Sequence, residues 1–407
     1  MNDSAPPAAL GPGYLRDPHP CNAALREDGP VHEVRLPTGL KVWVVTGHAA
    51  ARAALADPRL SKDMRHTREL FDRHMDQPVK RRGSGPSLAV NMLGSDPPDH
   101  TRLRRPVARA FTARRVAALR PRVEEVARRL LTDMAPRREA NLLEAYAYPL
   151  SITVIGELLG VPERDHGDFQ AWARTLLDQS AGDREQARRA AAAMADYLTA
   201  LVAAKRAAPG EDLLTALVEA EGEQELDEEE LVSTAFLLLL AGFETTVNLI
   251  GNGMFALLTD PAQHAALRED PSRIPDAVEE FLRFEGPANL ASYRYTTAPV
   301  DIAGTAVPAG EFVLVSLSAA NRDPARFPAP DRLDLARDAS GHLAFGHGIH
   351  RCLGAPLARL EGEIAFRELL CRFPDIRLAV PPEQVTWQPS TLVRAVEALP
   401  VAWGEAR

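Results

Sequence analysis

The sequence predicts a mainly helical protein with a few small β-sheets. Alanine- and leucine-rich stretches with helical periodicity fill the chain from about residue 100 to about residue 284. Short β-type segments bounded by turn signals lie before and after this stretch. The 407 residues are 45% hydrophobic and 25% charged, which is enough apolar material for a sizeable core. We expect one domain over residues 1–407, in which residues 1–13 form a flexible tail.

The strands are expected in two regions of the chain. Near the N-terminus, Val31–Arg35 and Lys41–Thr46 are of β type and are separated by a turn-like segment. A second β-like region, Tyr293–Leu317, contains turn signals at Asp301–Gly304 and Pro308–Gly310. Both regions are short, so they predict small sheets beside a larger helical part.

The longest predicted helix is the most informative one. Asp227 and Glu230 form a capping box at its start, and its pattern continues to Leu258, a length of roughly 45 Å. The helix is apolar nearly all round over residues 236–243, so we expect that part to be buried. Glu244 follows directly, and a buried carboxylate is costly unless it is paired or used. The residues alone leave open whether Glu244 is a satisfied core acid or a functional one.

Composition excludes several classes of protein. The N-terminus lacks the charged and apolar regions of a signal peptide, and the longest apolar run, Ala235–Phe243, is too short to span a bilayer. A net charge of −9 argues against a general nucleic-acid binder. The three cysteines are widely spaced, which excludes a disulfide framework and fits a reducing compartment. We therefore expect a soluble cytoplasmic protein without a membrane or nucleic-acid partner.

One segment is strongly basic although the chain as a whole is acidic. Between Thr101 and Leu130 there are ten arginines against Glu124 and Glu125, a local excess of +8. Such a segment is either a solvated helix face or a docking surface for an acidic protein, because clustered charge steers encounter. Pro106 lies inside this presumed helix, so we expect a kink or break there.

The stretch from Gly341 to Glu361 concentrates potential metal ligands, namely His342, His347, His350 and Cys352. A zinc site normally needs a second ligand pair, and none is nearby in sequence. A single thiolate fits better, because a helix expected from about Pro356 to Arg372 places Cys352 just before its N-terminus. A cysteine in that setting can be a nucleophile or an axial metal ligand.

Two motifs in this sequence are distinctive. The pattern Phe345-x-x-Gly348-x-x-x-Cys352-x-Gly354 resembles the haem-binding loop of the cytochrome P450 family. The run Ala-Gly-Phe-Glu-Thr-Thr over residues 241–246 resembles its oxygen-activation motif on the long central helix. The resemblance implies the P450 fold, with a large helical domain and a smaller β-rich region.

Three further motifs extend the resemblance in the family's order. Glu280 and Arg283 match the E-x-x-R motif, and the proline-studded segment at residues 321–335 resembles the one that supplies a second arginine, here Arg332. The segment Asp96–Phe111 resembles the helix that contacts a haem propionate in bacterial members. The match is closest to soluble actinobacterial members that oxidise macrolides, other bulky natural products or drugs.

The resemblance implies haem b as the cofactor, with Cys352 as the thiolate ligand of the iron. His100 and Arg104 lie one helical turn apart and can meet one propionate. The haem contacts implied by the resemblance are His100, Arg104, Ala241, Gly242, Arg294, Phe345, Gly348, His350 and Gly354.

The same resemblance makes Glu244 and Thr245 the catalytic pair that delivers protons during oxygen activation. Thr245 can bond the carbonyl of Ala241, four residues earlier, and Gly242 is expected to leave room for O₂. An intact pair favours ordinary monooxygenation. The alternative is a haem-thiolate protein that binds ligands without turnover, such as a sensor, and such a protein needs no proton relay.

Periodicity and resemblance disagree about Glu280 and Arg283. The apolar stripe of their helix leaves both residues on the apparent solvent side, which predicts a weak surface pair. The resemblance implies instead a buried structural network with Arg332.

The substrate pocket is expected to be apolar and partly covered by a mobile loop, His66–Asp96, which is rich in glycine and serine. Its candidate lining residues are Leu88, Val90, Met92, Phe236, Leu240, Phe243, Leu290, Ala291 and Leu392. The expected reaction is hydroxylation or epoxidation of a bulky apolar small molecule. By resemblance, electrons come from NAD(P)H through a ferredoxin reductase and a ferredoxin that docks near the arginines of residues 101–130. We expect a monomer.

Overall fold

In the computed structural model the chain divides into two compact units. The structure describes residues 8–63, 65, 67–76, 91–177, 184–222 and 226–404. The β-rich unit comprises residues 1–82, 279–352 and 387–395, and the helical unit comprises residues 83–278, 353–386 and 396–407. The two β-type regions of the sequence fall in the first unit and most of the helices in the second.

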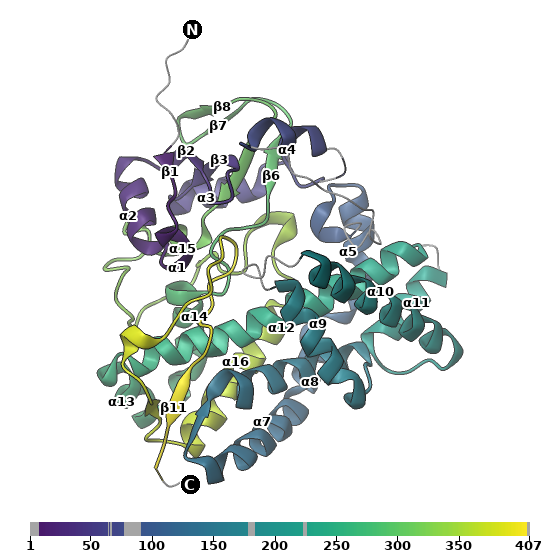
Figure 1. Ribbon diagram of the computed structural model, residues 1–407, viewed down its shortest axis with the longest axis vertical. Coiled ribbons are helices and arrows are strands. Elements are labelled where there is room, and N and C mark those ends of the chain that lie inside the picture. Colours follow the sequence, from purple (N-terminus) through teal and green to yellow (C-terminus); the bar gives the residue numbers. More distant parts are fainter. Residues whose placement is uncertain are drawn as a thin grey trace. The chain divides into compact units, whose positions relative to one another are not determined.

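The main sheet of the β-rich unit has six strands in the order β1-β2-β3-β9-β6-β4. Their bounds are β1 Ala8–Ala9, β2 Val31–Arg35, β3 Lys41–Val45, β4 Leu60–Ser61, β6 Arg294–Thr296 and β9 Phe312–Val315. Strands β2 and β3 lie in the two β segments predicted near the N-terminus and pair antiparallel (Figure 1). Strands β3 and β9 pair parallel. The strands β7 Val300–Ile302 and β8 Thr305–Val307 form a separate hairpin.

The tail expected over residues 1–13 is partly wrong. Ala8 pairs with Val34 across β1 and β2, and α1 already begins at Gly13. Residues 1–7 lie outside the described part. The pairing supplies hydrogen bonds to this edge of the sheet that composition alone does not reveal.

Apolar residues that alternate along β9 pack on both faces of the main sheet. Phe312 and Leu314 belong to one apolar cluster of buried residues, and Val313 and Val315 belong to the other. Successive strand residues point to opposite faces, so this division buries β9 on both sides. The helices of this unit are α1 Gly13–Arg16, α2 His19–Asp28, α3 His48–Ala56, α4 Arg68–His74 and α15 Leu317–Asn321. The C-terminal part of α14 (Ile274–Glu285) also belongs to it.

The helical unit contains the long helical middle predicted from the sequence. Its helices are α5 Asp99–Ala110, α6 Ala113–Ala118, α7 Arg120–Met134, α8 Tyr148–Leu159, α9 His166–Leu177, α10 Arg184–Ala207, α11 Leu213–Gly222, α12 Glu228–Leu258, α13 Pro261–Glu269 and α16 Ala355–Arg372. A three-stranded sheet, β10 Arg377–Leu378, β11 Pro400–Ala402 and β5 Glu139–Asn141, was not expected there. Helix α5 continues through Pro106, so of the two expected effects, a kink or a break, the break is absent.

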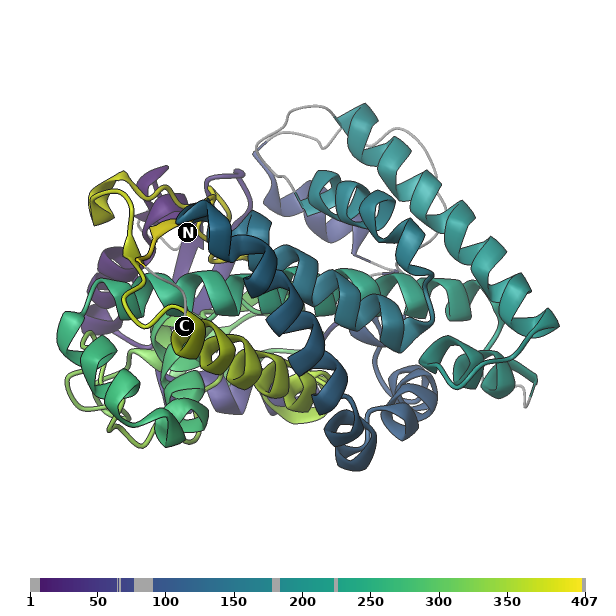
Figure 2. The same ribbon diagram turned by 90° about the horizontal axis from the view of Figure 1, so that it is seen from below.

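Helix α12 forms the centre of this unit. Both hydrogen bonds of the predicted capping box are present at its start, between Asp227 and Glu230. It packs against α8 and α16, and α16 in turn packs along α7 (Figure 2). By length and composition α12 could cross a membrane, but 67% of its most apolar window is buried, as in the core helix of a globular protein.

Candidate active site

The cysteine loop of the β-rich unit is closed by a main-chain hydrogen bond. The N–H of Cys352 donates to the carbonyl of Phe345 over 2.9 Å, and the side chain of Cys352 is exposed. Gly346 and Gly348 have φ values of +68° and +74°, which favour glycine. A Cβ at Gly348 would lie 2.8 Å from the carbonyl oxygen of Leu55, so the loop needs glycine to approach α3. The loop therefore holds its thiol in a fixed, accessible position.

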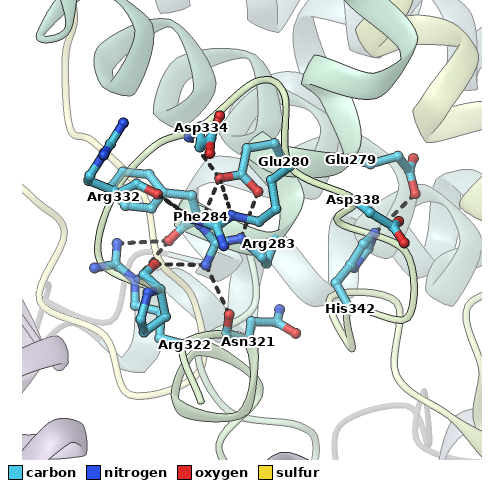
Figure 3. Close-up of polar contacts among 12 residues, drawn as sticks. Glu279, Glu280, Arg283, Phe284, Asn321, Arg322, Arg332, Asp334, Asp338 and His342 are labelled. Atoms are coloured by element: carbon cyan, nitrogen blue, oxygen red, sulfur yellow. Dashed lines mark hydrogen bonds and ion pairs between the residues drawn. The ribbon is translucent and has the colours of Figure 1, made fainter. Parts of the chain in front are cut away.

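The nearby histidines have separate environments. The Nε2 atom of His342 lies 3.1 Å from a carboxylate oxygen of Glu279, and its Nδ1 atom accepts from the N–H of Ala344 (Figure 3). His347 lies at the surface beside Arg52, where burial and the Arg52 charge lower its pKa. Across the described ranges, no three His, Cys, Asp or Glu side chains are grouped so that they could hold a metal ion. The zinc interpretation thus gains no support.

One face of helix α12 is exposed within the sequence Ala-Gly-Phe-Glu-Thr-Thr, residues 241–246. Ala241 and Thr245 are exposed, whereas Phe243, Glu244 and Thr246 between and beside them are buried. The hydroxyl of Thr245 donates to the carbonyl of Ala241 over 2.6 Å, which confirms the expected bond. The expectation that this part of the helix is buried all round is wrong, because a face of small residues is left open.

Glu244 is the acid beside that open face. It is 7% exposed, and burial raises its pKa to about 7. Desolvation disfavours the charged carboxylate, so a large share of the molecules carry a proton on Glu244 at neutral pH. An acid whose pKa lies near the working pH suits proton transfer.

Gly242 also has a packing role. A Cβ on Gly242 would lie 2.9 Å from the Cδ1 atom of Ile155 on α8. The missing side chain therefore lets α8 and α12 pack closely, and its direction is already filled by Ile155.

The candidate propionate ligands are distributed over both units. In the helical unit, His100 is 3% exposed and Arg104 half-buried, one turn apart on α5 as predicted. In the β-rich unit, Arg294 is 5% exposed at the start of β6, and His350 is half-buried in the cysteine loop. Gly354 is the N-cap residue of α16. Arginine and histidine side chains of this kind can donate hydrogen bonds to carboxylates.

The pair Glu280–Arg283 is fully buried, which contradicts the surface pair that periodicity predicts. Nε of Arg283 donates to Glu280 over 2.7 Å, and neither side chain is exposed. Nη1 of Arg283 also donates to the carbonyls of Asn321 and Pro330. The segment from Asn321 to Arg337 covers the face of α14 that looked open in the sequence (Figure 3).

The second arginine of this network is Arg337, so the assignment of Arg332 is wrong. The Nε atom of Arg337 lies 3.2 Å from a carboxylate oxygen of Glu280. Arg332 is exposed and joins only through its main-chain carbonyl, which accepts from Arg283 over 3.3 Å (Figure 3). Arg337 follows on the same segment, and no pattern in the residues distinguishes the two arginines.

The candidate pocket residues divide into three groups. Leu88 and Val90 lie outside the described residues. Met92, Phe243 and Leu290 are buried. The ring of Phe243 packs on that of Tyr148, with ring centroids 5.6 Å apart. Leu290 belongs to the apolar cluster that includes Phe312 and Leu314 of the main sheet. Phe243 and Leu290 are therefore core residues rather than pocket residues. The half-buried candidates are Phe236, Leu240, Ala291 and Leu392.

At least five of the ten arginines between Thr101 and Leu130 are ion-paired within the helical unit. The pairs are Arg102–Glu230, Arg120–Glu363, Arg122–Glu157, Arg128–Glu368 and Arg129–Glu163. These contacts neutralise much of the local excess of charge and brace α5 and α7. Arg114 and Arg115 on the short helix α6 are exposed.

The β-rich unit presents a fixed thiol, and the helical unit presents a proton-carrying acid and a helix face of small residues. A family model described as Cytochrome P450 matches residues 152–393 of the chain. The chain belongs to the cytochrome P450 family. This P450 is 51% identical over 98% of its length to the cytochrome P450 monooxygenase PikC of Streptomyces venezuelae, of which 94% is covered. It is 47% identical over 96% of its length to vitamin D(3) 25-hydroxylase of Pseudonocardia autotrophica, of which 95% is covered.

Solved structures give the same result for the fold. The P450 matches the tirandamycin C-bound P450 monooxygenase TamI with a TM-score of 0.90 and 46% identity, over 98% of this chain and 100% of that one. The P450 fold, with its large helical part and smaller β-rich part, is therefore confirmed. The protein is a monooxygenase and not a passive ligand binder.

The residues present fit the haem b of this family. A haem needs an accessible thiolate, flat surfaces without large side chains, and cations for its propionates. The P450 offers the exposed Cys352 in its closed loop, the open face at Ala241 and Thr245, and the buried His100 and Arg294. Each unit supplies part of this set.

Proposed function

We propose that this P450 inserts one oxygen atom from O₂ into a bulky apolar natural product of the macrolide or polyketide type, by hydroxylation or epoxidation. PikC and TamI are supporting relatives, and a further one, 44% identical over 93% of this chain, is the 6-deoxyerythronolide B hydroxylase of Saccharopolyspora erythraea. The observation that carries the proposal is the open face of α12. Along this helix the half-buried, apolar Phe236 and Leu240 precede the exposed Ala241 and the exposed hydroxyl of Thr245.

The chain's own residues hold the cofactor and manage protons. The haem, when bound, supplies the activation of O₂ that no side chain can perform. Cys352 is proposed as its thiolate ligand, with Phe345, Gly348 and Gly354 shaping the loop around the sulfur. The proposed propionate ligands are His100, Arg104, Arg294 and His350.

Proton delivery is proposed to run through Glu244 and Thr245. Glu244 holds a proton near neutral pH because burial raises its pKa to about 7. The hydroxyl of Thr245 stays oriented by its bond to Ala241 and is exposed on the open face, where it can donate or pass on a proton. The small side chain of Ala241 on the same face keeps bulk away from this hydroxyl.

Electrons are proposed to come from NAD(P)H through a ferredoxin reductase and a ferredoxin in the cytoplasm. The docking surface is narrower than the sequence indicates, because at least five of the ten arginines are engaged in ion pairs. We place it on α6, at Arg114 and Arg115. The double reversal Arg114→Glu/Arg115→Glu should slow reduction by ferredoxin about tenfold at low salt and less at high salt. An unchanged rate at low salt refutes this docking site.

The substrate class is tested by spectral titration and product analysis. A bound apolar substrate displaces water at the haem and shifts the Soret band, so macrolactones and smaller aromatic compounds can be ranked by affinity. The proposal predicts micromolar binding of a macrolactone such as 6-deoxyerythronolide B and, under ¹⁸O₂, one labelled oxygen in the product. Tight binding restricted to small aromatic compounds contradicts it.

A further inference from the structure

Two segments that carry half-buried pocket candidates meet in the β-rich unit. One is residues 287–291, which ends at Ala291, and the other is Trp387–Ala395, called the strap here, which carries Leu392. The N–H of Arg394 donates to the carbonyl of Pro287 over 2.8 Å, and Ala288 pairs with Val393. The relative position of these segments therefore fixes where Ala291 and Leu392 lie.

Asn289 bonds the strap next to Leu392 with both its main chain and its side chain. Its N–H donates to the carbonyl of Leu392 over 2.8 Å. Its side-chain Nδ2 donates to the carbonyl of Thr391 over 2.9 Å. Asn289 is 1% exposed, so these bonds form away from water, where losing one is costly.

The other side of Asn289 is tied to the start of α15. Its carbonyl accepts from the N–H groups of Leu317 and Ser318, over 2.9 and 3.2 Å. Its Oδ1 accepts from the hydroxyl of Ser318, which in turn accepts from the Nδ2 of Asn22 on α2 over 3.0 Å. Asn289 thus links the strap to a buried polar cluster on two other elements of the unit.

This set of partners requires an amide. The carbonyl of Thr391 can only accept, whereas the hydroxyl of Ser318 can donate, so one side chain must offer a donor and an acceptor at once. A carboxylate of the same size keeps the bond from Ser318 but places a negative oxygen against the carbonyl of Thr391. Aspartate at this position would therefore push the strap away.

At its other end the strap is held by charge. The Nε atom of Arg394 lies 3.1 Å from a carboxylate oxygen of Glu285, and the guanidinium of Arg394 stacks on Trp387. Glu285 also pairs with Arg322. These contacts anchor the base of the strap, and Asn289 is the side chain that bonds it beside Leu392.

We propose that Asn289 is a positioning residue for substrate binding: it holds the strap against residues 287–291 and so sets the distance between Leu392 and Ala291. The inference rests on the proposed function in that these two residues are taken to line the substrate cavity. It goes beyond that function because Asn289 touches neither substrate nor cofactor and acts through the strap.

The test compares two isosteric changes in one buried cluster of the holoprotein. Asn289→Asp removes the side-chain bond to the strap and keeps the main-chain bond to Leu392, whereas Asn22→Asp alters the same cluster at a residue that does not bond the strap. Asn22 is also 1% exposed. Hydrogen exchange of the strap amides should rise about tenfold in Asn289→Asp and stay at the wild-type rate in Asn22→Asp. Equal exchange in both variants, whether raised or not, overturns the proposal.

A second readout reports on the cavity without depending on the native substrate. Clotrimazole and imidazole both bind haem iron through an azole nitrogen, but clotrimazole is bulky and also needs the cavity wall. The affinity for clotrimazole divided by the affinity for imidazole should fall about tenfold in Asn289→Asp and remain unchanged in Asn22→Asp. A ratio unchanged in Asn289→Asp overturns the positioning role, whereas failure of macrolactones to bind the wild type overturns only the proposed substrate class.

Ser318→Ala keeps the test decisive if Asn289→Asp does not fold. It removes the donor that orients the amide of Asn289 and leaves Asn289 itself in place. The same two measurements should change in the same direction by about threefold. No change in either measurement contradicts the proposal.

Discussion

The hydroxyl of Thr245 donates a hydrogen bond to the carbonyl of Ala241, 2.6 Å away and one turn earlier on α12. Both residues are exposed on the one open face of a helix that is otherwise largely buried. The bond keeps the hydroxyl oriented on that face before any substrate arrives.

Removing this hydroxyl should uncouple electron consumption from oxygen insertion. Thr245→Ala is expected to form about tenfold less product per NAD(P)H, with a matching rise in hydrogen peroxide, because a proton donor at the open face is lost. Thr245→Ser retains a hydroxyl that can bond Ala241 and should stay within about twofold of wild type. Equal coupling in wild type and Thr245→Ala contradicts the role given to Thr245.

Proton supply by Glu244 should depend on pH in a defined direction. Burial raises the pKa of this carboxyl to about 7, so its acid form is abundant below that pH and is lost as the pH rises through it. Turnover should therefore decline above pH 7, and Glu244→Gln should be slower with no such decline. Difference infrared spectroscopy measures the same group directly: a protonated-carboxyl band that titrates near pH 7 should be absent from Glu244→Gln. A band that titrates at the ordinary pH of a glutamate argues against this mechanism.

The network around Glu280 predicts different effects for two neighbouring arginines. Arg337→Ala should lower the free energy of unfolding by about 2 kcal/mol, because it removes a buried partner of Glu280. Arg332→Ala should change it by less than about 0.5 kcal/mol, since this side chain is exposed and its carbonyl is retained. Thermal unfolding of the two holoproteins checks both values. Similar decreases in the free energy of unfolding in the two variants would restore Arg332 as the second arginine of the network.

The contact between Gly242 and Ile155 predicts a coupled pair of substitutions. Gly242→Ala should destabilise the protein by about 1 kcal/mol, because overpacking against Ile155 exceeds the gain in helix propensity. In an Ile155→Val background the Cδ1 atom in the way is gone, so the same change should be neutral or stabilising. The double-mutant cycle from thermal unfolding measures this coupling. Additive effects would show that Gly242 does not set the approach of α8 to α12.

Local patterns were sufficient to predict much of the fold. The capping box at Asp227 and Glu230 and the strands Val31–Arg35 and Lys41–Val45 depend on residues close in sequence, and all are present. The bond from Thr245 to Ala241 is likewise set within one helical turn.

What the sequence could not predict depends on segments that meet only in the folded chain. Glu280 and Arg283 look exposed on their helix because the segment that buries them lies about forty or more residues later. Arg337 is selected over Arg332 by the path of that segment, in which Ala329 adopts a positive φ of 47° and main-chain carbonyls turn toward the guanidinium groups. The bonds of Asn289 to the strap join positions about a hundred residues apart, and no periodicity reports on them.

The central claim is that this P450 acts through a haem bound by the thiolate of Cys352. The most direct test is the absorption spectrum of the reduced protein with carbon monoxide. The account predicts the long-wavelength Soret band of thiolate-ligated haem in the wild type and its loss in Cys352→His, with haem still bound. A wild-type spectrum without that band, or a Cys352→His variant that retains it, contradicts the account.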